Sequence, residues 1–132
     1  MKVIDGKDAV LGRLASYVAK EALKGEEIAI INSEQIKITG SYKDIKEDFD
    51  ASKNKKGSTF KGPEISIKTE KIVKRVIRGM LPNHREGRGK QALHRVKCYK
   101  GLPKELESYK AEIIEIAKPR RNKYIRVKDI GK

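Results

Sequence analysis

The sequence predicts an α/β protein, because an apolar strand, an amphipathic helix and a second apolar strand follow one another at its start. Lys2–Asp5 is apolar at its centre, and residues 10–23 repeat apolar side chains with a helical period. Gly25 then stops the helix, and Glu27–Ile31 has the continuous apolar character of a buried parallel strand. These pieces form a βαβ unit, whose crossover is expected to be right-handed.

Capping residues, glycines and hydrophobic periodicity predict the later elements. Asp8, Ser41 and Thr69 are candidate N-caps of three successive helices. Gln35–Thr39 is expected to be a further short strand or an extension of the preceding strand. It is followed by a helix Tyr42–Ala51 with Ile45 and Phe49 inward, a mobile surface loop Lys53–Pro63 and a helix from Thr69 to Met80. After these come a loop Asn83–Lys90, a helical turn Gln91–Arg95, a strand Val96–Tyr99, a short helix from Pro103 to Ser108 and a strand Lys123–Val127.

The 132 residues fit a single domain, and their charge is concentrated in its second half. Residues 1–66 contain 12 Lys/Arg and 11 Asp/Glu, whereas residues 67–132 contain 20 and 7. A net charge of +14 indicates nucleic acid or an anionic membrane surface as partner. We interpret residues 1–40 as a βαβ scaffold, residues 67–101 as a contact helix and loop, and residues 118–132 as a basic C-terminal extension.

The helix predicted from Thr69 has two chemically different faces. At about 100° per residue, its apolar side chains fall on one side and its cations on the other. Glu70 is the only acid nearby, so salt bridges do not account for the cations, and their mutual repulsion favours a polyanionic partner over a merely solvated face. The apolar set is Ile72, Val73, Val76, Ile77 and Met80, and the cationic set is Lys71, Lys74, Arg75 and Arg78.

A glycine-rich basic segment, residues 76–101, contains a single acid, Glu86, and has apolar residues at both ends to hold it rigidly. Glycine lets backbone N–H groups approach phosphate closely, and arginine makes forked contacts with phosphate oxygens. Nucleic-acid binding is therefore favoured over a generally soluble basic surface. The candidate contacts are His84, Arg85, Arg88, Lys90, His94, Arg95, Lys97 and Lys100, joined by Arg120 and Arg121 in the C-terminal part.

Several function classes lack the residues they need. With 5% aromatic residues and no Trp, a stacking platform for single strands is not expected, and folded RNA read by its shape fits best. The lone Cys98 excludes an internal disulfide, and the spacing of His84 and His94 matches no metal site. No acid is placed to orient either histidine, so we expect no catalysis and no cofactor. The absence of a transmembrane-length apolar run and of a signal region favours the cytosol.

The turn Gly6–Arg13, GKDAVLGR, follows a strand and opens a helix, as phosphate-binding loops do. Its spacing departs from the nucleotide-binding P-loop, because five residues separate the glycines and Arg-Leu replaces Lys-Ser/Thr. Lys7 and Arg13 are possible contacts to a backbone phosphate, and the simpler interpretation is a tight strand-to-helix turn. A small nucleotide-binding enzyme using this turn is a second functional hypothesis. A regulatory binder of messenger RNA is a third.

Three pieces of the chain resemble the large-subunit ribosomal protein thirteen family, in its archaeal and eukaryotic form. The most specific piece is RGMLP followed by a glycine-rich basic loop and ALxRxKxYxG, whereas residues 42–64 carry no part of the resemblance. The three pieces are VIDGKDAVLGRLASYVAK at residues 3–20, IAIINSEQIKITG at residues 28–40 and RGMLPNHREGRGKQALHRVKCYKGLP at residues 78–103.

The resemblance implies a three-layer α/β/α fold, for which we expect a small, mainly parallel four-stranded sheet. It implies a structural, non-catalytic protein that binds large-subunit ribosomal RNA beside neighbouring large-subunit ribosomal proteins and aids subunit assembly in the cytoplasm. No membrane, small-molecule substrate or cofactor is implied, and we expect a monomer off the ribosome. By motif position, residues at or beside the RNA would be Arg78, Gly79, Arg88, Gly89, Arg95, Lys97 and Tyr99, with Gly79 and Tyr99 supporting the fold.

Overall fold

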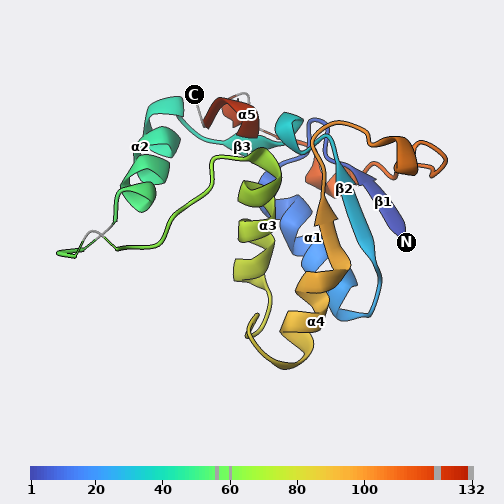
Figure 1. The fold of residues 1–132 in the computed structure, drawn as a ribbon. Coiled ribbons are helices and arrows are strands. Elements are labelled where there is room, and N and C mark those ends of the chain that lie inside the picture. Colours follow the sequence, from blue (N-terminus) through green and yellow to red (C-terminus); the bar gives the residue numbers. More distant parts are fainter. Residues whose placement is uncertain (56, 60, 121–122, 131–132) are drawn as a thin grey trace.

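A three-stranded parallel sheet is the larger of the two described sheets and lies beside α1, α3 and α4 (Figure 1). In this computed structural model the described residues are 1–55, 57–59, 61–120 and 123–130. The strands β1 (Lys2–Asp5), β2 (Ile28–Ile31) and β4 (Val96–Cys98) lie in the order β1-β2-β4, and both neighbouring pairs are parallel. Because α1 (Leu11–Leu23) connects β1 to β2, the predicted βαβ unit is confirmed.

The two faces of this sheet are covered differently. Ile4, Ile28, Ile30 and Val96 belong to the large core cluster, which includes buried residues of α1, α3 (Thr69–Met80) and α4 (Gly87–Arg95). Side chains alternate along a strand, and Val3, Ala29 and Ile31 accordingly pack on the other face with Leu106 of the 3-10 helix η2 (Lys104–Leu106). Among the described residues that second face has no α-helix over it, so the three-layer α/β/α arrangement is not confirmed.

The C-terminal part closes a second, two-stranded sheet. β3 (Lys37–Thr39) pairs antiparallel with β5 (Tyr124–Arg126), and α5 (Val127–Ile130) follows directly. The backbone N–H of Val127 donates to the carbonyl of Ile36 at 2.9 Å, and Val127 is fully buried. The expectation of one four-stranded sheet is therefore wrong, since the described strands divide into three and two. Residues 118–132, predicted as an extension, supply core residues through β5 and α5.

The remaining elements are short or peripheral. α2 (Tyr42–Lys53) begins at the predicted N-cap Ser41 but has no fully buried residue, and its inward residues Ile45 and Phe49 are half-buried. The helix predicted from Pro103 is only the 3-10 turn η2, and further 3-10 helices are η1 (Ser33–Gln35) and η3 (Glu115–Ala117). The predicted loop Lys53–Pro63 includes residues 56 and 60, which lie outside the described residues.

Three local predictions were wrong for identifiable reasons. Asp8 does not cap α1, because it adopts a left-handed turn conformation with φ of 60° and pairs with Lys37 at 2.9 Å. Val10 is the N-cap instead, and in α3 the cap is Lys68, with Thr69 as the first helical residue. Met80 is 44% exposed, because it is the last residue of α3 and lies beyond the part of the helix that packs on the sheet.

Candidate nucleic-acid interface

Helix α3 presents its predicted cations on the side opposite the core. Ile72, Val73 and Ile77 are buried. Three of the four cations, Lys71, Arg75 and Arg78, are exposed and line one hollow of about 250 Å³ with residues 63–66. The fourth, Lys74, is half-buried at the edge of the cationic face, on the side of Cys98. The cationic face thus belongs to a helix whose opposite face is packed in the core.

The basic segment after α3 is more regular than predicted. Helix α4 begins at Gly87, so residues 87–90, which we expected in a loop, form its first turn. Two glycines misled the sequence interpretation. Gly87 has a φ of +63°, and a Cβ on Gly89 would lie only 1.9 Å from the carbonyl oxygen of Pro82. Gly89 is therefore required by the close approach of residues 82–83 to the first turn of α4.

The cations of this loop and helix point away from the core. Gly89 and Ala92 are buried, whereas Arg85, Arg88 and Lys90 are exposed. Asn83 Oδ1 accepts a hydrogen bond from the backbone N–H of Arg85 at 3.2 Å, which shapes the turn before the helix. Within the described part of the chain, no acid or carbonyl accepts a hydrogen bond from these three cationic side chains. His84, just before Arg85, is half-buried, whereas His94 and Lys97, further along the chain, are exposed.

Two predicted contact residues differ from this group in their surroundings. The guanidinium Nη1 of Arg95 donates to the carbonyl of Ala22 at 3.3 Å, so this side chain satisfies the last turn of α1. Lys100 lines a hollow of about 570 Å³ with Glu34 and Glu70, beside the first residues of α3. It is therefore separated from Arg88 by the length of α3. The sequence placed Lys100 around the same glycines, and the structure does not bring it to them.

The remaining motif residues have different surroundings. Tyr99 is half-buried and packs with the cluster on the second face of the sheet, in keeping with a supporting role. Gly79 is exposed, and a Cβ there would meet no atom within 4 Å. Arg120 is exposed in the C-terminal part, and Arg121 lies outside the described residues.

The turn Gly6–Arg13 is held by internal hydrogen bonds. The Gly6 N–H donates to the Ile31 carbonyl at 3.0 Å, and the Val10 N–H donates to the Ala117 carbonyl at 2.6 Å. A Cβ on Gly6 would come within 2.8 Å of Ile36. Lys7 is exposed, and Arg13 Nη1 donates to the Lys118 carbonyl at 3.2 Å. These contacts favour the tight strand-to-helix turn over a nucleotide-binding loop.

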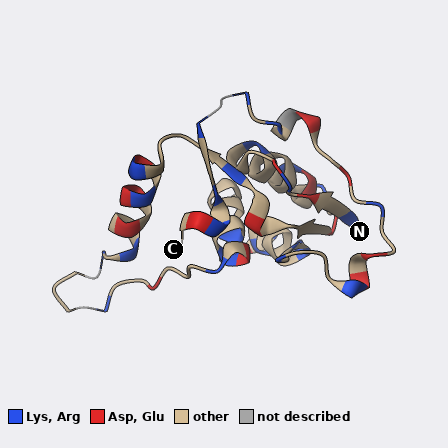
Figure 2. Ribbon diagram, turned by 90° about the horizontal axis from the view of Figure 1, so that it is seen from above, with Lys and Arg blue, Asp and Glu red and all other residues tan. Residues whose placement is uncertain are grey.

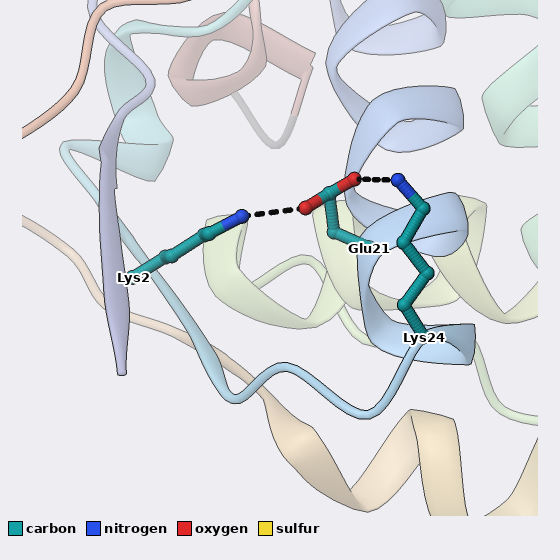
Figure 3. Close-up of polar contacts among 3 residues, drawn as sticks. All are labelled: Lys2, Glu21 and Lys24. Atoms are coloured by element: carbon teal, nitrogen blue, oxygen red, sulfur yellow. Dashed lines mark hydrogen bonds and ion pairs between the residues drawn. The ribbon is translucent and has the colours of Figure 1, made fainter.

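A three-residue cluster at the other end of α1 shows how some cations are neutralised internally. Glu21 is buried and accepts from Lys2 at 2.6 Å and from Lys24 at 2.7 Å (Figure 3). These two partners lower the pKa of Glu21 to about 2, and the same contact raises the pKa of Lys2.

The charges of α2 and α3 differ in arrangement. Figure 2 shows Lys/Arg and Asp/Glu interleaved along α2, whereas Glu70 is the one acid of α3. The thiol of Cys98 is no candidate nucleophile, because burial raises its pKa to about 12. The described residues contain no group of three or more His, Cys, Asp or Glu side chains that could hold a metal ion. Among them no helix is both long and apolar enough to cross a membrane.

Fold and surface thus define a small basic α/β protein with cations presented outward from a rigid helix, loop and helix. A model of the family described as ribosomal protein L13 matches residues 1–105. The chain is 39% identical, over 135 residues, to large ribosomal subunit protein uL13 of Methanococcoides burtonii, covering 100% of this chain and 96% of that protein. It is 45% identical to the Methanopyrus kandleri protein of the same name, covering 87% and 71%. It is 44% identical to the protein of the same name from Thermoplasma volcanium, and the match covers 87% of this chain and 83% of that protein. The chain belongs to the ribosomal protein L13 family.

Proposed function

We propose that the protein is a structural constituent of the large ribosomal subunit that binds and stabilises large-subunit ribosomal RNA and aids subunit assembly. The relatives matched over most of their length are named as large-subunit proteins. It would act in the cytoplasm beside neighbouring large-subunit proteins, as a monomer before it joins the subunit. It needs no membrane, cofactor or small-molecule substrate, and its role is not catalytic.

The observation that carries the proposal is the outward presentation of cations by α3, the loop after it and α4. A lysine or arginine that meets a phosphate releases condensed counterions, and this release drives binding. The buried faces of α3 and α4 fix where those cations lie, so that little conformational freedom is lost on binding. Phosphate contacts set the position of the protein on folded RNA without reading its sequence.

The proposed RNA-binding set keeps every predicted residue, as a direct contact or, for Arg95, as a supporting residue. Arg85, Arg88 and Lys90 form the centre, and Lys100 would serve a second region at the start of α3. Arg95, already bonded to α1, would mainly hold α4 in place. The full set is Lys71, Lys74, Arg75, Arg78, His84, Arg85, Arg88, Lys90, His94, Arg95, Lys97, Lys100, Arg120 and Arg121, with Lys7 and Arg13 as further phosphate contacts.

The test is the salt dependence of binding between the purified chain and large-subunit ribosomal RNA. Affinity should fall steeply with salt, and replacing Arg85, Arg88 and Lys90 together with Ala should lower the logarithmic slope by about 2 to 3. A control that removes the same charge elsewhere, at Lys20, Lys55 and Lys110, should leave that slope nearly unchanged. A flat salt response of the unaltered chain, or its absence from washed large subunits, would contradict the proposal.

A further inference from the structure

Two tyrosines from distant parts of the sequence line one hollow, which is separate from the cations of α3, the loop after it and α4. Tyr42 begins α2 and Tyr124 begins β5, and both line a hollow of about 390 Å³ at the junction of α2, β5 and α5. Tyr42 is 51% exposed and Tyr124 is 42% exposed. Figure 1 shows the start of α2 on the same side of the molecule as α5. The chain has only five tyrosines and no Trp, so such a pairing stands out from its low aromatic content.

Each ring is held by a lysine. The Lys37 ammonium lies 4.1 Å from the centroid of the Tyr124 ring, and Lys37 is itself buried and paired with Asp8 at 2.9 Å. One turn along α2, the Lys46 ammonium lies 5.5 Å from the centroid of the Tyr42 ring and donates to its hydroxyl at 3.2 Å. The Lys37 ammonium is close enough to be attracted by the π-face of Tyr124, whereas Lys46 holds Tyr42 chiefly through its hydroxyl. Both rings are therefore oriented before any partner arrives, yet much of their surface is left in water.

The charges around the hollow indicate what it would take. Arg126 and Lys128 line it together with one acid, Asp129. Lys43 and Lys123, next to the two tyrosines in the sequence, are exposed. Aromatic faces surrounded by cations match a nucleotide, which offers a flat base for stacking and a phosphate for the cations. A basic protein segment would be repelled by the same surroundings.

We propose that this hollow binds an unpaired base of the ribosomal RNA by stacking on Tyr42, Tyr124 or both. The inference rests on the proposed function, because it assumes that the bound partner is RNA. It also changes the expectation from composition, since a chain poor in aromatic residues still places two of them at one hollow. The base would come from a loop or bulge, where bases are free to leave their own stack.

The experiment measures binding of the full chain to its own organism's large-subunit ribosomal RNA, at several salt concentrations. Replacing Tyr42 and Tyr124 together with Leu should weaken binding about tenfold or more, because a stacked base is lost. The salt slope should not change, because no cation is removed. Replacing both with Phe should retain the affinity, because the rings remain. The control Tyr109→Leu removes an exposed tyrosine elsewhere and should have no effect.

The outcomes separate this inference from the proposed function. If the unaltered chain binds with a steep salt slope but the double Leu variant binds within twofold of it, the stacking site is refuted and the RNA-binding role stands. If the Phe variant is as weak as the Leu variant, stacking is also refuted. If the unaltered chain does not bind, both proposals fall. Ultraviolet crosslinking of the unaltered chain, with adducts expected on Tyr42 or Tyr124, tests the site even where the double variant fails to fold.

Discussion

Helices α1 and α3 pack on the same face of the sheet, but the cations around them have different surroundings. Around α1, Glu21 holds two lysines, the Lys118 carbonyl accepts from Arg13, and the Ala22 carbonyl accepts from Arg95. On α3, among the described residues, no acceptor engages the side chains of Lys71, Arg75 and Arg78. The comparison teaches that positive charge alone does not mark a contact surface. What distinguishes the proposed contact surface is a set of cationic side chains that no acceptor among the described residues engages, on a helix whose other face is packed in the core.

The largest effect expected from this comparison comes from neighbouring residues on opposite faces of α3. Ile77 is fully buried, so Ile77→Asp should lower the free energy of unfolding by more than about 3 kcal/mol, because an unpaired carboxylate enters the core. Arg78→Asp, at an exposed position, should change it by no more than about 0.5 kcal/mol while weakening RNA binding. Urea denaturation and RNA titration measure the two quantities. Equal loss of stability in both variants would show that the two faces are misassigned.

A second test concerns the two glycines that bracket the loop. Gly89→Ala should lower the free energy of unfolding by about 2 kcal/mol or more, because its Cβ would collide with the Pro82 carbonyl. Gly79→Ala meets open space and should stabilise α3 by up to about 1 kcal/mol. Thermal melting compares them. A neutral Gly89→Ala variant with unchanged RNA affinity would mean that the loop does not depend on this close contact.

A smaller effect should separate two arginines of α4. Arg95→Met removes the hydrogen bond to the Ala22 carbonyl and should lower the free energy of unfolding by about 1 kcal/mol. Arg88→Met removes an exposed side chain and should leave stability nearly unchanged while lowering RNA affinity. If instead Arg95→Met cost more RNA affinity than Arg88→Met at equal stability, Arg95 would be a direct contact and not a supporting residue.

The smallest effect should appear in acid. The pKa of Glu21 is lowered from 4.5 to about 2, so its contacts stabilise the fold fully above about pH 4.5 and lose that contribution as the pH falls towards 2. Glu21→Gln should therefore lower the melting temperature slightly near neutrality, where the contacts contribute fully, and flatten its dependence on pH across this window. Glu34→Gln is the comparison variant, because the Glu34 carboxylate accepts a hydrogen bond from the Gly101 N–H and not from a lysine. An identical acid profile for Glu21→Gln and the unaltered chain would contradict the assignment.

Regular elements with strong periodicity were predictable from the sequence. The strands at Lys2–Asp5 and Ile28–Ile31 and the helices α1 and α3 were predicted because local pattern and burial agree there. Helix α4 was shortened in the prediction because Gly87 and Gly89 indicated a loop. The structure uses one for a left-handed φ and the other for a close backbone contact. Such contacts depend on what lies across the fold, which local composition does not reveal.

Long-range pairing accounts for the other differences. Nothing local to Lys37–Thr39 indicates that its partner is Tyr124–Arg126, so the second sheet was merged into the first. For the same reason the meeting of Tyr42 and Tyr124 could not be foreseen. In the candidate interface, the face of α3 was predictable from helical geometry. The internal engagement of Arg95 was not, because its acceptor lies on α1.

The pairing of β3 with β5 also bears on how the protein matures as it is made. Chains emerge N-terminus first, and the βαβ unit, α3 and α4 are complete before residue 100. The carbonyl of Ile36 finds its partner, the Val127 N–H, only after α3, α4 and β4 have been made. A nascent chain therefore carries its cationic helices into the surroundings while one part of its core still awaits Ile125, Val127 and Ile130. Completion of the fold therefore waits until β5 and α5 have been made.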